Sequence, residues 1–387
     1  MKQILCLNKI SPIGTEKLNP VDYTLSSDAK NPDAILVRSA AMHDMEFSEN
    51  LLCIARAGAG VNNIPIERCS KEGIVVFNTP GANANAVKEL AICALLLASR
   101  RIVEGAEWAQ ALKGSEGVAK TVESGKSQFG GVELMGKKLG VIGLGAIGGL
   151  VANAAVDLGM EVIGCDPYLS VDAAWNIDHR VHKAATFEEV FREADYVTLH
   201  VPSTPQTKDM ISKDSLAIMR DGVRIINLAR ADLVSAEAVK EALLSGKVKA
   251  YVTDFPTEET VGVPGVITIP HLGASTEEAE DNCAVMAVQE LDEYVRYGNI
   301  RNSVNFPAVS MPFGGKQRVC VLHQNIPAQI SQITTILSQS GANIENMINK
   351  SRGDNAYSMF DMTGKDVPEE TIRALAKIDG VLKVRMI

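Results

Sequence analysis

Three polar residues could carry acid–base chemistry, and each follows an apolar run that is typical of a β-strand. Arg230 lies in the segment INLARADL, Glu258 in DFPTEE and His271 in IPHLGAST. Removing a hydride from a secondary alcohol requires a base for the hydroxyl proton, a partner that orients the base and a cation for an acidic substrate. Histidine, glutamate and arginine can supply these functions, and catalytic side chains of doubly wound folds collect at the carboxyl ends of strands. The three residues therefore form a candidate catalytic group.

A glycine motif, Gly143-x-Gly145-x-x-Gly148, lies between an apolar strand-like run and a helix-like run. In dinucleotide-binding folds the first glycine permits a tight turn, the second lets the backbone approach a pyrophosphate, and the third lets helix and strand pack closely. The phosphates then face the helix N-terminus. Asp166 ends the next strand, where a carboxylate binds the adenosine ribose and repels a 2′-phosphate, which favours NAD over NADP. A turn without a ligand, with Asp166 as a turn residue before Pro167, is the alternative.

The composition excludes several classes of protein. The 387 residues, 46% hydrophobic and 22% charged, predict two or three globular domains. A net charge of −9 argues against a nucleic-acid partner. The seven cysteines form no Cys-x-x-Cys pair, which predicts reduced thiols and no metal site. The longest apolar stretch, Leu90 to Ala98, is about half a membrane span and the first residues lack a secretory pattern, so we expect a cytoplasmic protein without a membrane partner.

Strand-like and helix-like runs alternate along most of the chain, which predicts an α/β fold with parallel sheets. Strands are expected at residues 2–7, 34–37, 53–57, 74–77, 139–142, 161–165, 196–199, 224–227, 250–253 and 266–269. Helices are expected at residues 147–158, 236–245 and 277–297. Residues 86–110 form a long amphipathic segment, followed by a glycine-containing stretch at 114–131. The alternation predicts two doubly wound, Rossmann-like domains.

The C-terminal part follows a different order of elements. Residues 302–316 contain prolines and two adjacent glycines and are interpreted as a connecting region. Strands are then expected at 318–323, 343–349, 357–362 and 382–387, and helices at 327–340 and 368–378. This βαββαβ order predicts a ferredoxin-like domain.

Four segments in order carry a family resemblance: FGGVELMGKKLGVIGLGAIG (129–148), ADYVTLHVPSTPQT (194–207), INLARADLVSAEAVKEAL (226–243) and PHLGASTEEAEDN (270–282). Over nearly all of its first 310 residues the chain resembles the D-isomer-specific 2-hydroxyacid dehydrogenase family. The resemblance implies that His271 is the general acid/base, that Glu258 hydrogen-bonds its other ring nitrogen, and that Arg230 binds the substrate carboxylate and polarises the reacting carbon–oxygen bond. The family usually has Glu-Pro where this chain has Glu258-Glu259, so either carboxylate could be the partner, and it commonly has glycine at Ala231.

The resemblance also implies a set of NAD contacts. An aspartate near the nicotinamide amide corresponds to Asp254, although an ungapped alignment puts Thr253 there. The implied cofactor-binding residues are Gly143, Gly145, Ala146, Ile147, Gly148, Asp166, His200, Val201, Pro202, Leu228, Ala229, Arg230, Asp254, His271, Gly273 and Ala274.

By resemblance, residues 1–90 and 275–310 form a discontinuous substrate-binding domain, residues 91–274 form the NAD-binding domain, and catalysis occurs in a cleft between them. The substrate-binding residues implied are Arg38, Ser39, Gly58, Ala59, Gly60, Arg230 and His271. Arg38 and Ser39 can hold a distal phosphate and the glycine-rich backbone can hold a carboxylate. A surface charge at a strand end is the alternative for Arg38.

Residues 318–387, after a linker at 311–317, resemble an ACT domain, a regulatory module that binds amino acids. The segments HQNIPA (323–328) and GANI (341–344) match its serine-sensing version, except that Ala328 replaces a common glycine. The resemblance implies that His323, Asn325 and Asn343 bind L-serine. Asn325 could instead be a turn residue before Pro327.

The order of a dehydrogenase followed by an ACT domain implies NAD-dependent oxidation of 3-phosphoglycerate to 3-phosphohydroxypyruvate in L-serine biosynthesis. A homodimer or homotetramer, with L-serine as a possible allosteric effector, is expected from the same resemblance. The alternatives are another 2-hydroxyacid dehydrogenase, such as a glyoxylate or hydroxypyruvate reductase, and an NAD-sensing binding protein of the corepressor type.

Overall fold

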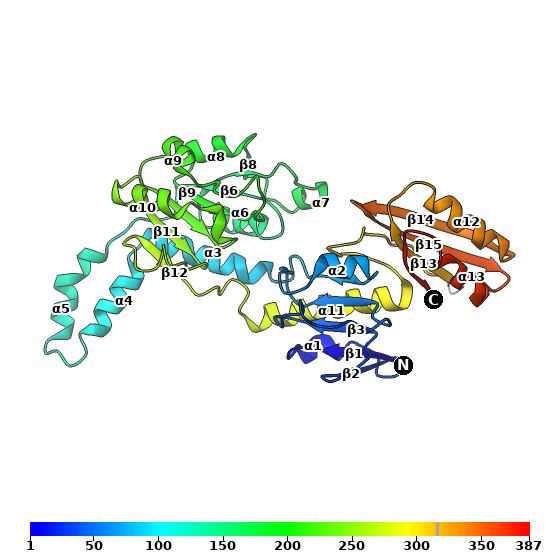
Figure 1. Ribbon diagram of the computed structural model, residues 1–387. Helices are drawn as coiled ribbons and strands as arrows, with labels where there is room; N and C mark the ends of the chain where they lie inside the picture. Colours follow the sequence, from blue (N-terminus) through cyan, green and yellow to red (C-terminus); the bar gives the residue numbers. More distant parts are fainter. Residues whose placement is uncertain (315–316) are drawn as a thin grey trace. The chain divides into compact units, whose positions relative to one another are not determined.

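The computed structural model describes residues 1–314 and 317–387 (Figure 1). The chain forms two compact units: Met1–Asn83 together with Glu277–Ile387, and Ala84–Thr276. No helix of the described residues is both long and apolar enough to cross a membrane.

The second unit contains a seven-stranded, fully parallel sheet in the order β12-β11-β10-β9-β6-β7-β8. Its strands are β6 (Lys138–Ile142), β7 (Glu161–Cys165), β8 (His182–Lys183), β9 (Tyr196–Leu199), β10 (Val223–Asn227), β11 (Val248–Thr253) and β12 (Val266–Thr268). Adjacent residues of a strand point to opposite faces: Ile225 of β10 lies in one hydrophobic core and Ile226 in another. Burial on both faces explains why these strands are continuous apolar runs.

Helices cover both faces of this sheet. One core contains α3 (Ala84–Ser99) and α6 (Gly148–Asp157), and the other contains α8 (Phe187–Glu193), α9 (Lys213–Ile218) and α10 (Ala236–Leu244). The short elements α7 (Val171–Ala174) and η2 (Ala231–Leu233) complete this part of the unit. Helices α8, α9 and α10 begin after Thr186, Ser212 and Ser235, whose hydroxyls accept a backbone N–H of the first turn.

Residues 100–130 differ from the expected pattern. The predicted segment at 86–110 is two helices, α3 and α4 (Ile102–Ala111), and the glycine-containing stretch holds α5 (Val118–Gly125) and η1 (Lys126–Phe129). No residue of α4 or α5 is buried, and Figure 1 shows this pair extending beyond the sheet. The ring of Trp108 packs on Phe129, with 5.3 Å between ring centroids. Because neither helix has a buried face, hydrophobic periodicity could not reveal α5.

The first unit contains a five-stranded parallel sheet in the order β2-β1-β3-β4-β5. Its elements are β1 (Lys2–Cys6), α1 (Pro12–Thr15), β2 (Tyr23–Ser26), β3 (Ala34–Val37), β4 (Cys53–Arg56), α2 (Ile66–Lys71) and β5 (Val75–Phe77). The helix α11 (Glu277–Tyr297) joins them from far along the chain, because its Ala287 and Leu291 share a core with Cys53 and Ala55 of β4.

The C-terminal residues of this unit form an antiparallel sheet in the order β14-β15-β13-β16. Its elements are β13 (Arg318–Gln324), α12 (Gln329–Gln339), β14 (Ala342–Arg352), β15 (Asn355–Gly364), α13 (Glu369–Leu375) and β16 (Val381–Met386). The helices cover one face, while Leu322 and Tyr357 on the other face share a core with Tyr294 of α11. The α/β class with two parallel sheets and a βαββαβ module is confirmed.

The composition of residues 302–316 suggested a linker, whereas the family resemblance placed residues up to 310 in the substrate-binding domain, and the first part of this region is packed. Ser303, Asn305, Phe306 and Val309 are buried, and Asn305 hydrogen-bonds the backbone of Ile74 and Val76 near β5. Prolines and polar residues suggested a linker. The packing was not foreseen because the hydrogen-bond partners of Asn305 lie more than two hundred residues away in the sequence. Of the linker predicted at 311–317, residues 315–316 lie outside the described residues.

Candidate active site

The glycine motif forms the turn between β6 and α6, as its spacing predicts. Gly143 has φ +88°, which a side chain would strain, and a Cβ on Gly148 would lie 1.8 Å from the carbonyl oxygen of Gly143. A Cβ on Gly145 would meet no atom within 4 Å, so this face of the loop is open. The turn therefore has the close packing and the open backbone that a pyrophosphate requires.

Asp166 directly follows β7 and is tied to the glycine loop. Its Oδ2 accepts the Leu144 N–H at 2.9 Å and its Oδ1 accepts the Tyr168 N–H at 2.9 Å. The carboxylate lies in a pocket of about 820 Å³ whose walls include Leu144, Pro167, Leu169, Val171, Trp175, Ile177, Val181 and His182. Apolar walls beside the Asp166 carboxylate fit an adenosine, with the ring against the walls and the ribose hydroxyls on Asp166. We call this cavity beside Asp166 the adenosine pocket.

His200 and Val201 follow β9 and lie against the glycine loop, since a Cβ on Gly143 would meet the His200 carbonyl at 2.5 Å and the Val201 side chain at 2.8 Å. Burial lowers the pKa of His200 to about 4, so its ring is neutral. Its Nε2 pairs with the hydroxyl of Thr198 at 2.9 Å. Pro202 follows as an exposed residue. His200 is thus held by a hydrogen bond to Thr198 and carries no charge near neutral pH.

The turn after β10 presents Arg230. Buried Asn227 donates from Nδ2 to the Arg230 carbonyl at 2.8 Å, and its Oδ1 accepts the Ala229 N–H at 3.2 Å. The Arg230 side chain is exposed and donates to the Ala229 carbonyl, and among the described residues no carboxylate lies within ion-pair distance of it. Leu228 is buried beneath the turn. The arrangement leaves a guanidinium available to bind an anion.

Asp254 lies between β11 and the segment that carries His271. Its Oδ2 accepts the Gly273 N–H at 3.1 Å, and its backbone carbonyl accepts the His271 N–H at 2.9 Å. Its Oδ1 is buried and has no hydrogen-bond partner within the described chain. Burial raises the pKa of Asp254, while the Gly273 N–H and then the charges of His271 and Arg230 act in the opposite direction. A buried acceptor without a partner is what an amide N–H of a ligand would satisfy.

His271 is exposed and has a strained backbone, with φ +41°. Its ring packs against Phe255, with 4.6 Å between ring centroids. Glu258 and Glu259 are both exposed, and within the described residues neither one hydrogen-bonds His271. Glu259 lines a separate pocket of about 410 Å³ with Asp232 and Lys240, whereas Glu258 does not. The structure therefore joins Asp254 to the His271 segment but joins neither glutamate to the His271 ring.

In the first unit, Arg38 follows β3, the central strand, at the carboxyl edge of the parallel sheet. Its guanidinium pairs with Glu280 of α11, with 2.6 Å between Nη2 and Oε1. The N–H groups of Arg38, Ser39 and Ala40 all donate to Oδ1 of Asn8 at 3.0 Å. One amide oxygen thus shapes the whole loop, and Arg38 is already paired with a carboxylate.

The loop after β4 has free backbone donors. The N–H groups of Ala59 and Gly60 donate to no acceptor in the described part of the chain, and the Ala59 carbonyl accepts from Nδ2 of Asn78. Gly58 has φ +154°, and a Cβ there would lie 2.7 Å from Nη1 of Arg56. This loop can present two N–H groups to an anion.

The C-terminal module gives its three candidate residues different environments. His323 is buried, and its ring nitrogens pair with the Gln324 carbonyl at 2.8 Å and the Ser358 hydroxyl at 2.9 Å. Asn325 and Asn343 are exposed and hydrogen-bond Gly353 and Thr363, respectively. Ala328 has φ +66°, a left-handed conformation that favours glycine. Only the two asparagines are available to a ligand from solvent.

Sequence reasoning missed Asn8, Thr198 and Asn227, which shape the loops of the candidate residues. Asn227 had a usable signal, because it is a polar residue that ends an apolar strand within the INLARADL segment. Asn8 had none, because its partners lie thirty or more residues along the chain.

The structure thus places the glycine loop, Asp166, Arg230, Asp254 and the His271 segment after strands of one parallel sheet, which defines a dinucleotide-binding domain with an exposed arginine and histidine. Residues 92–273 match the family model of the D-isomer specific 2-hydroxyacid dehydrogenase, NAD binding domain. A D-3-phosphoglycerate dehydrogenase of Escherichia coli is 31% identical over 354 residues, which cover 88% of this chain and 82% of that protein.

The chain belongs to the D-isomer-specific 2-hydroxyacid dehydrogenase family, and its cofactor is NAD. The D-3-phosphoglycerate dehydrogenase of Methanocaldococcus jannaschii is 35% identical over 302 residues, or 76% of this chain, and the chain spans only 55% of that relative's length. The crystal structure of an NAD⁺-bound 3-phosphoglycerate dehydrogenase from Entamoeba histolytica has the same fold, with a TM-score of 0.61, 24% identity and coverage of 79% and 98% of the two chains.

Proposed function

We propose that the chain is a D-3-phosphoglycerate dehydrogenase, which oxidises 3-phosphoglycerate to 3-phosphohydroxypyruvate with NAD⁺ in L-serine biosynthesis in the cytoplasm. The observation that carries the proposal is the unpaired, exposed Arg230 beside the buried Asp254 and the His271 segment in a family NAD-binding domain. The curated relatives of Escherichia coli and Methanocaldococcus jannaschii carry this name.

The NAD-binding residues would be those of the glycine loop, with Asp166 on the adenosine ribose and Asp254 on the nicotinamide amide. Support for Asp254 over Thr253 comes from the unpartnered Oδ1 of Asp254, because the Thr253 hydroxyl already accepts the Phe255 N–H. When bound, NAD⁺ supplies the acceptor for the hydride that leaves C2 of the substrate. The backbone of Leu228–Arg230 and of His271–Ala274, together with residues 200–202, would contact the nicotinamide side.

The chain's own residues would then manage the substrate's proton and charge. His271 takes the C2 hydroxyl proton during oxidation and returns it during reduction. Arg230 binds the carboxylate and polarises the carbon–oxygen bond. Glu258 orients the His271 ring, and the position of Glu259 in a separate pocket supports this choice between the two glutamates.

Arg38 and Ser39 would bind the substrate phosphate, and the N–H groups near Gly58, Ala59 and Gly60 would bind its carboxylate. The ion pair of Arg38 with Glu280 is then exchanged for one with the phosphate, whose larger charge makes the exchange favourable.

Substrate profiling tests the assignment against a glyoxylate or hydroxypyruvate reductase. Initial rates of NADH oxidation are measured with phosphohydroxypyruvate, hydroxypyruvate and glyoxylate. The proposal expects the highest kcat/KM with phosphohydroxypyruvate. Oxidation of NADH with glyoxylate or hydroxypyruvate but none with phosphohydroxypyruvate would overturn it, and no oxidation with any of the three would favour the corepressor-type alternative.

We further propose that residues 318–387 are an ACT domain that binds L-serine through Asn325 and Asn343. His323 would act by holding the module together, because both of its ring nitrogens already have partners. The rates above, repeated with L-serine, test this: inhibition that Asn325→Ala abolishes supports the site, and inhibition unchanged by that substitution contradicts it.

The assembly proposed is a homodimer or homotetramer. Helices α4 and α5 support it, because they bury no residue within the chain and expose Ile102, Val103 and Val118. Light scattering measures the molar mass, and a monomer would contradict the proposal.

A further inference from the structure

One wall of the adenosine pocket has little regular secondary structure of its own. Residues 174–182, from the last residue of α7 to the first residue of β8, contribute Ala174, Trp175, Ile177, Asp178, His179, Val181 and His182 to the pocket. An irregular segment keeps its place only where its backbone groups find fixed partners. What holds this wall therefore bears on how well the pocket fits its ligand.

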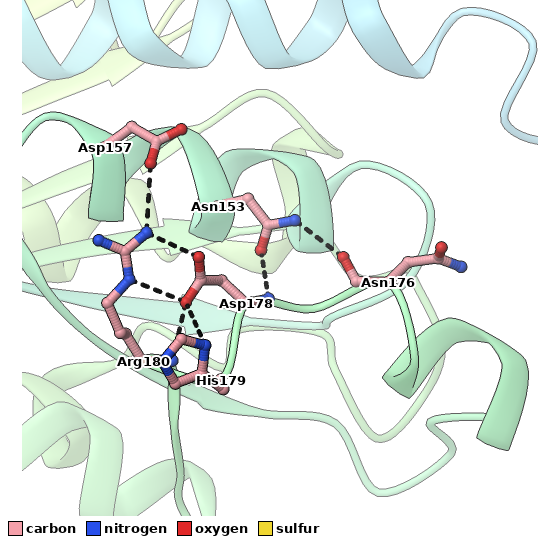
Figure 2. Close-up of polar contacts among 6 residues, drawn as sticks. All are labelled: Asn153, Asp157, Asn176, Asp178, His179 and Arg180. Atoms are coloured by element: carbon pink, nitrogen blue, oxygen red, sulfur yellow. Dashed lines mark hydrogen bonds and ion pairs between the residues drawn. The ribbon is translucent and has the colours of Figure 1, made fainter.

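Asn153 of α6 supplies two such partners with a single side chain (Figure 2). Its Oδ1 accepts the Asp178 N–H at 2.8 Å, and its Nδ2 donates to the Asn176 carbonyl at 2.8 Å. An amide side chain that bonds both a donor and an acceptor of the same stretch acts like a neighbouring strand. The wall is thereby attached to α6, the helix that begins at the last glycine of the motif.

Arg180 closes the same stretch through ion pairs. Its Nε and Nη2 bind Oδ1 and Oδ2 of Asp178 at 3.0 and 2.7 Å, and Nη2 also lies 3.3 Å from Oδ1 of Asp157 on α6 (Figure 2). Nδ1 of His179 lies 3.5 Å from the same Asp178 carboxylate. Arg180 and Asp157 are largely exposed, so these ion pairs alone would contribute little. The two bonds of Asn153 to the backbone carry most of the attachment, and the ion pairs reinforce it.

We propose that Asn153, supported by Arg180, is a positioning residue for the adenosine half of NAD: it holds the 174–182 wall at a fixed distance from the glycine loop. Neither side chain lines the pocket, so neither is expected to touch the cofactor. The inference rests on NAD binding in this pocket and does not depend on the identity of the substrate.

The test compares two halves of the cofactor by isothermal titration of the full chain with AMP and, separately, nicotinamide mononucleotide. Asn153→Ala removes two hydrogen bonds, so the Kd for AMP should rise about 3- to 10-fold, while the Kd for nicotinamide mononucleotide and kcat at saturating NADH stay within about twofold. Arg180→Gln should raise the AMP Kd by a smaller factor. Because it changes an exposed side chain, it should fold, and it tests the proposal even if Asn153→Ala does not fold.

Asn85→Ala is the matched control, because Asn85 is an exposed helix asparagine of the same unit whose side chain, in the described part of the chain, bonds the side chains of Glu89 and Lys88. Trp175 gives a second readout, since the chain has two tryptophans and Trp108→Phe leaves Trp175 as the single tryptophan, which is excited selectively at long wavelength. Its anisotropy without ligand should fall in Asn153→Ala. An AMP Kd unchanged in both variants, or equal losses for AMP and nicotinamide mononucleotide, would overturn the proposal. A parent chain that binds AMP but shows no dehydrogenase activity would count against the proposed function and leave this inference standing.

Discussion

Two regions of the molecule differ in how their charged side chains are paired. At the carboxyl edge of the second unit's sheet, Arg230 has no ion-pair partner in the described chain and Oδ1 of Asp254 has no hydrogen-bond partner. In the first unit, Arg38 is paired with Glu280, and Arg318 with Asp361. Groups without partners are available to ligands, whereas paired groups stabilise the fold until a ligand displaces the partner. The carboxyl edge of the second unit's sheet thus presents polar groups without partners, whereas Arg38 and Arg318 of the first unit are each paired with a carboxylate.

The largest expected effect is on kcat and concerns His271, an exposed residue at the carboxyl edge of the second unit's sheet. His271→Gln should lower kcat with phosphohydroxypyruvate ~10²–10⁴-fold, because the proton on the substrate oxygen loses its acid/base. The Kd for NADH, measured by fluorescence titration, should change little, since the His271 N–H to Asp254 is a backbone bond that survives the substitution. Full turnover in this variant would remove His271 from the mechanism.

The next effect is on stability and concerns Arg318, a buried and fully paired arginine of the first unit. Arg318 is completely buried; it binds both oxygens of Asp361 at 2.6 and 3.0 Å and donates to the carbonyls of Tyr297, Met311 and Pro312. Arg318→Ala leaves these acceptors and a buried carboxylate without a donor, so the free energy of unfolding should fall by about 3–5 kcal/mol. Urea denaturation measures it.

The double variant Arg318→Met, Asp361→Leu is the control, because it removes both charges and should recover much of the loss. A single variant as stable as the parent chain would mean that Arg318 is not a structural charge, and the contrast between the units would fail.

Sequence patterns predicted the candidate cofactor-binding residues far better than the residues that hold the fold together through distant partners. The glycine loop and Asp166 depend on the local backbone after a strand, so a short motif predicts them. The partners of Arg318, Asn8 and Asn153 are set by tertiary packing: Asp361 is 43 residues from Arg318, and Asp178 is 25 residues from Asn153. No local pattern encodes such pairs. The same reason explains why residues 302–309 suggested a linker although they pack against β5.

A smaller effect tests whether a loop-shaping residue of the first unit serves the substrate. Asn8→Ala removes the oxygen that accepts three N–H groups of residues 38–40. The KM for phosphohydroxypyruvate should rise about 10-fold while the KM for NADH stays unchanged, because the loop loses its preorganised shape. Steady-state kinetics with each substrate varied in turn measure both constants.

Asn19→Ala is the matched control for Asn8, since Asn19 makes a comparable side-chain bond to the Val21 N–H in an exposed turn. A KM for phosphohydroxypyruvate that stays at the parent value in Asn8→Ala would show that the 38–40 loop does not contact the substrate.

The last prediction concerns Glu290, a buried group of the first unit whose pairing is incomplete. Its Oε1 accepts from Asn302, but its Oε2 is buried and has no partner in the described chain. Burial raises the pKa of Glu290 from 4.5 to about 7, against the Asn302 hydrogen bond and the charge of Arg301. A carboxyl whose folded pKa exceeds its unfolded pKa stabilises the fold fully below the unfolded value, and that contribution is lost as the pH rises through the folded value.

The chain should therefore lose stability between about pH 4.5 and pH 7 through this residue, by at most about 3 kcal/mol. Glu290→Gln cannot ionise, so its free energy of unfolding, measured by urea denaturation at pH 5, 6, 7 and 8, should fall less with rising pH than that of the parent chain. Glu278→Gln, an exposed glutamate of the same helix, is the control and should keep the parent slope. Equal slopes in Glu290→Gln and the parent chain would mean that Glu290 is charged in the folded state, and its unpartnered oxygen would then require a cation or water in the core of the first unit.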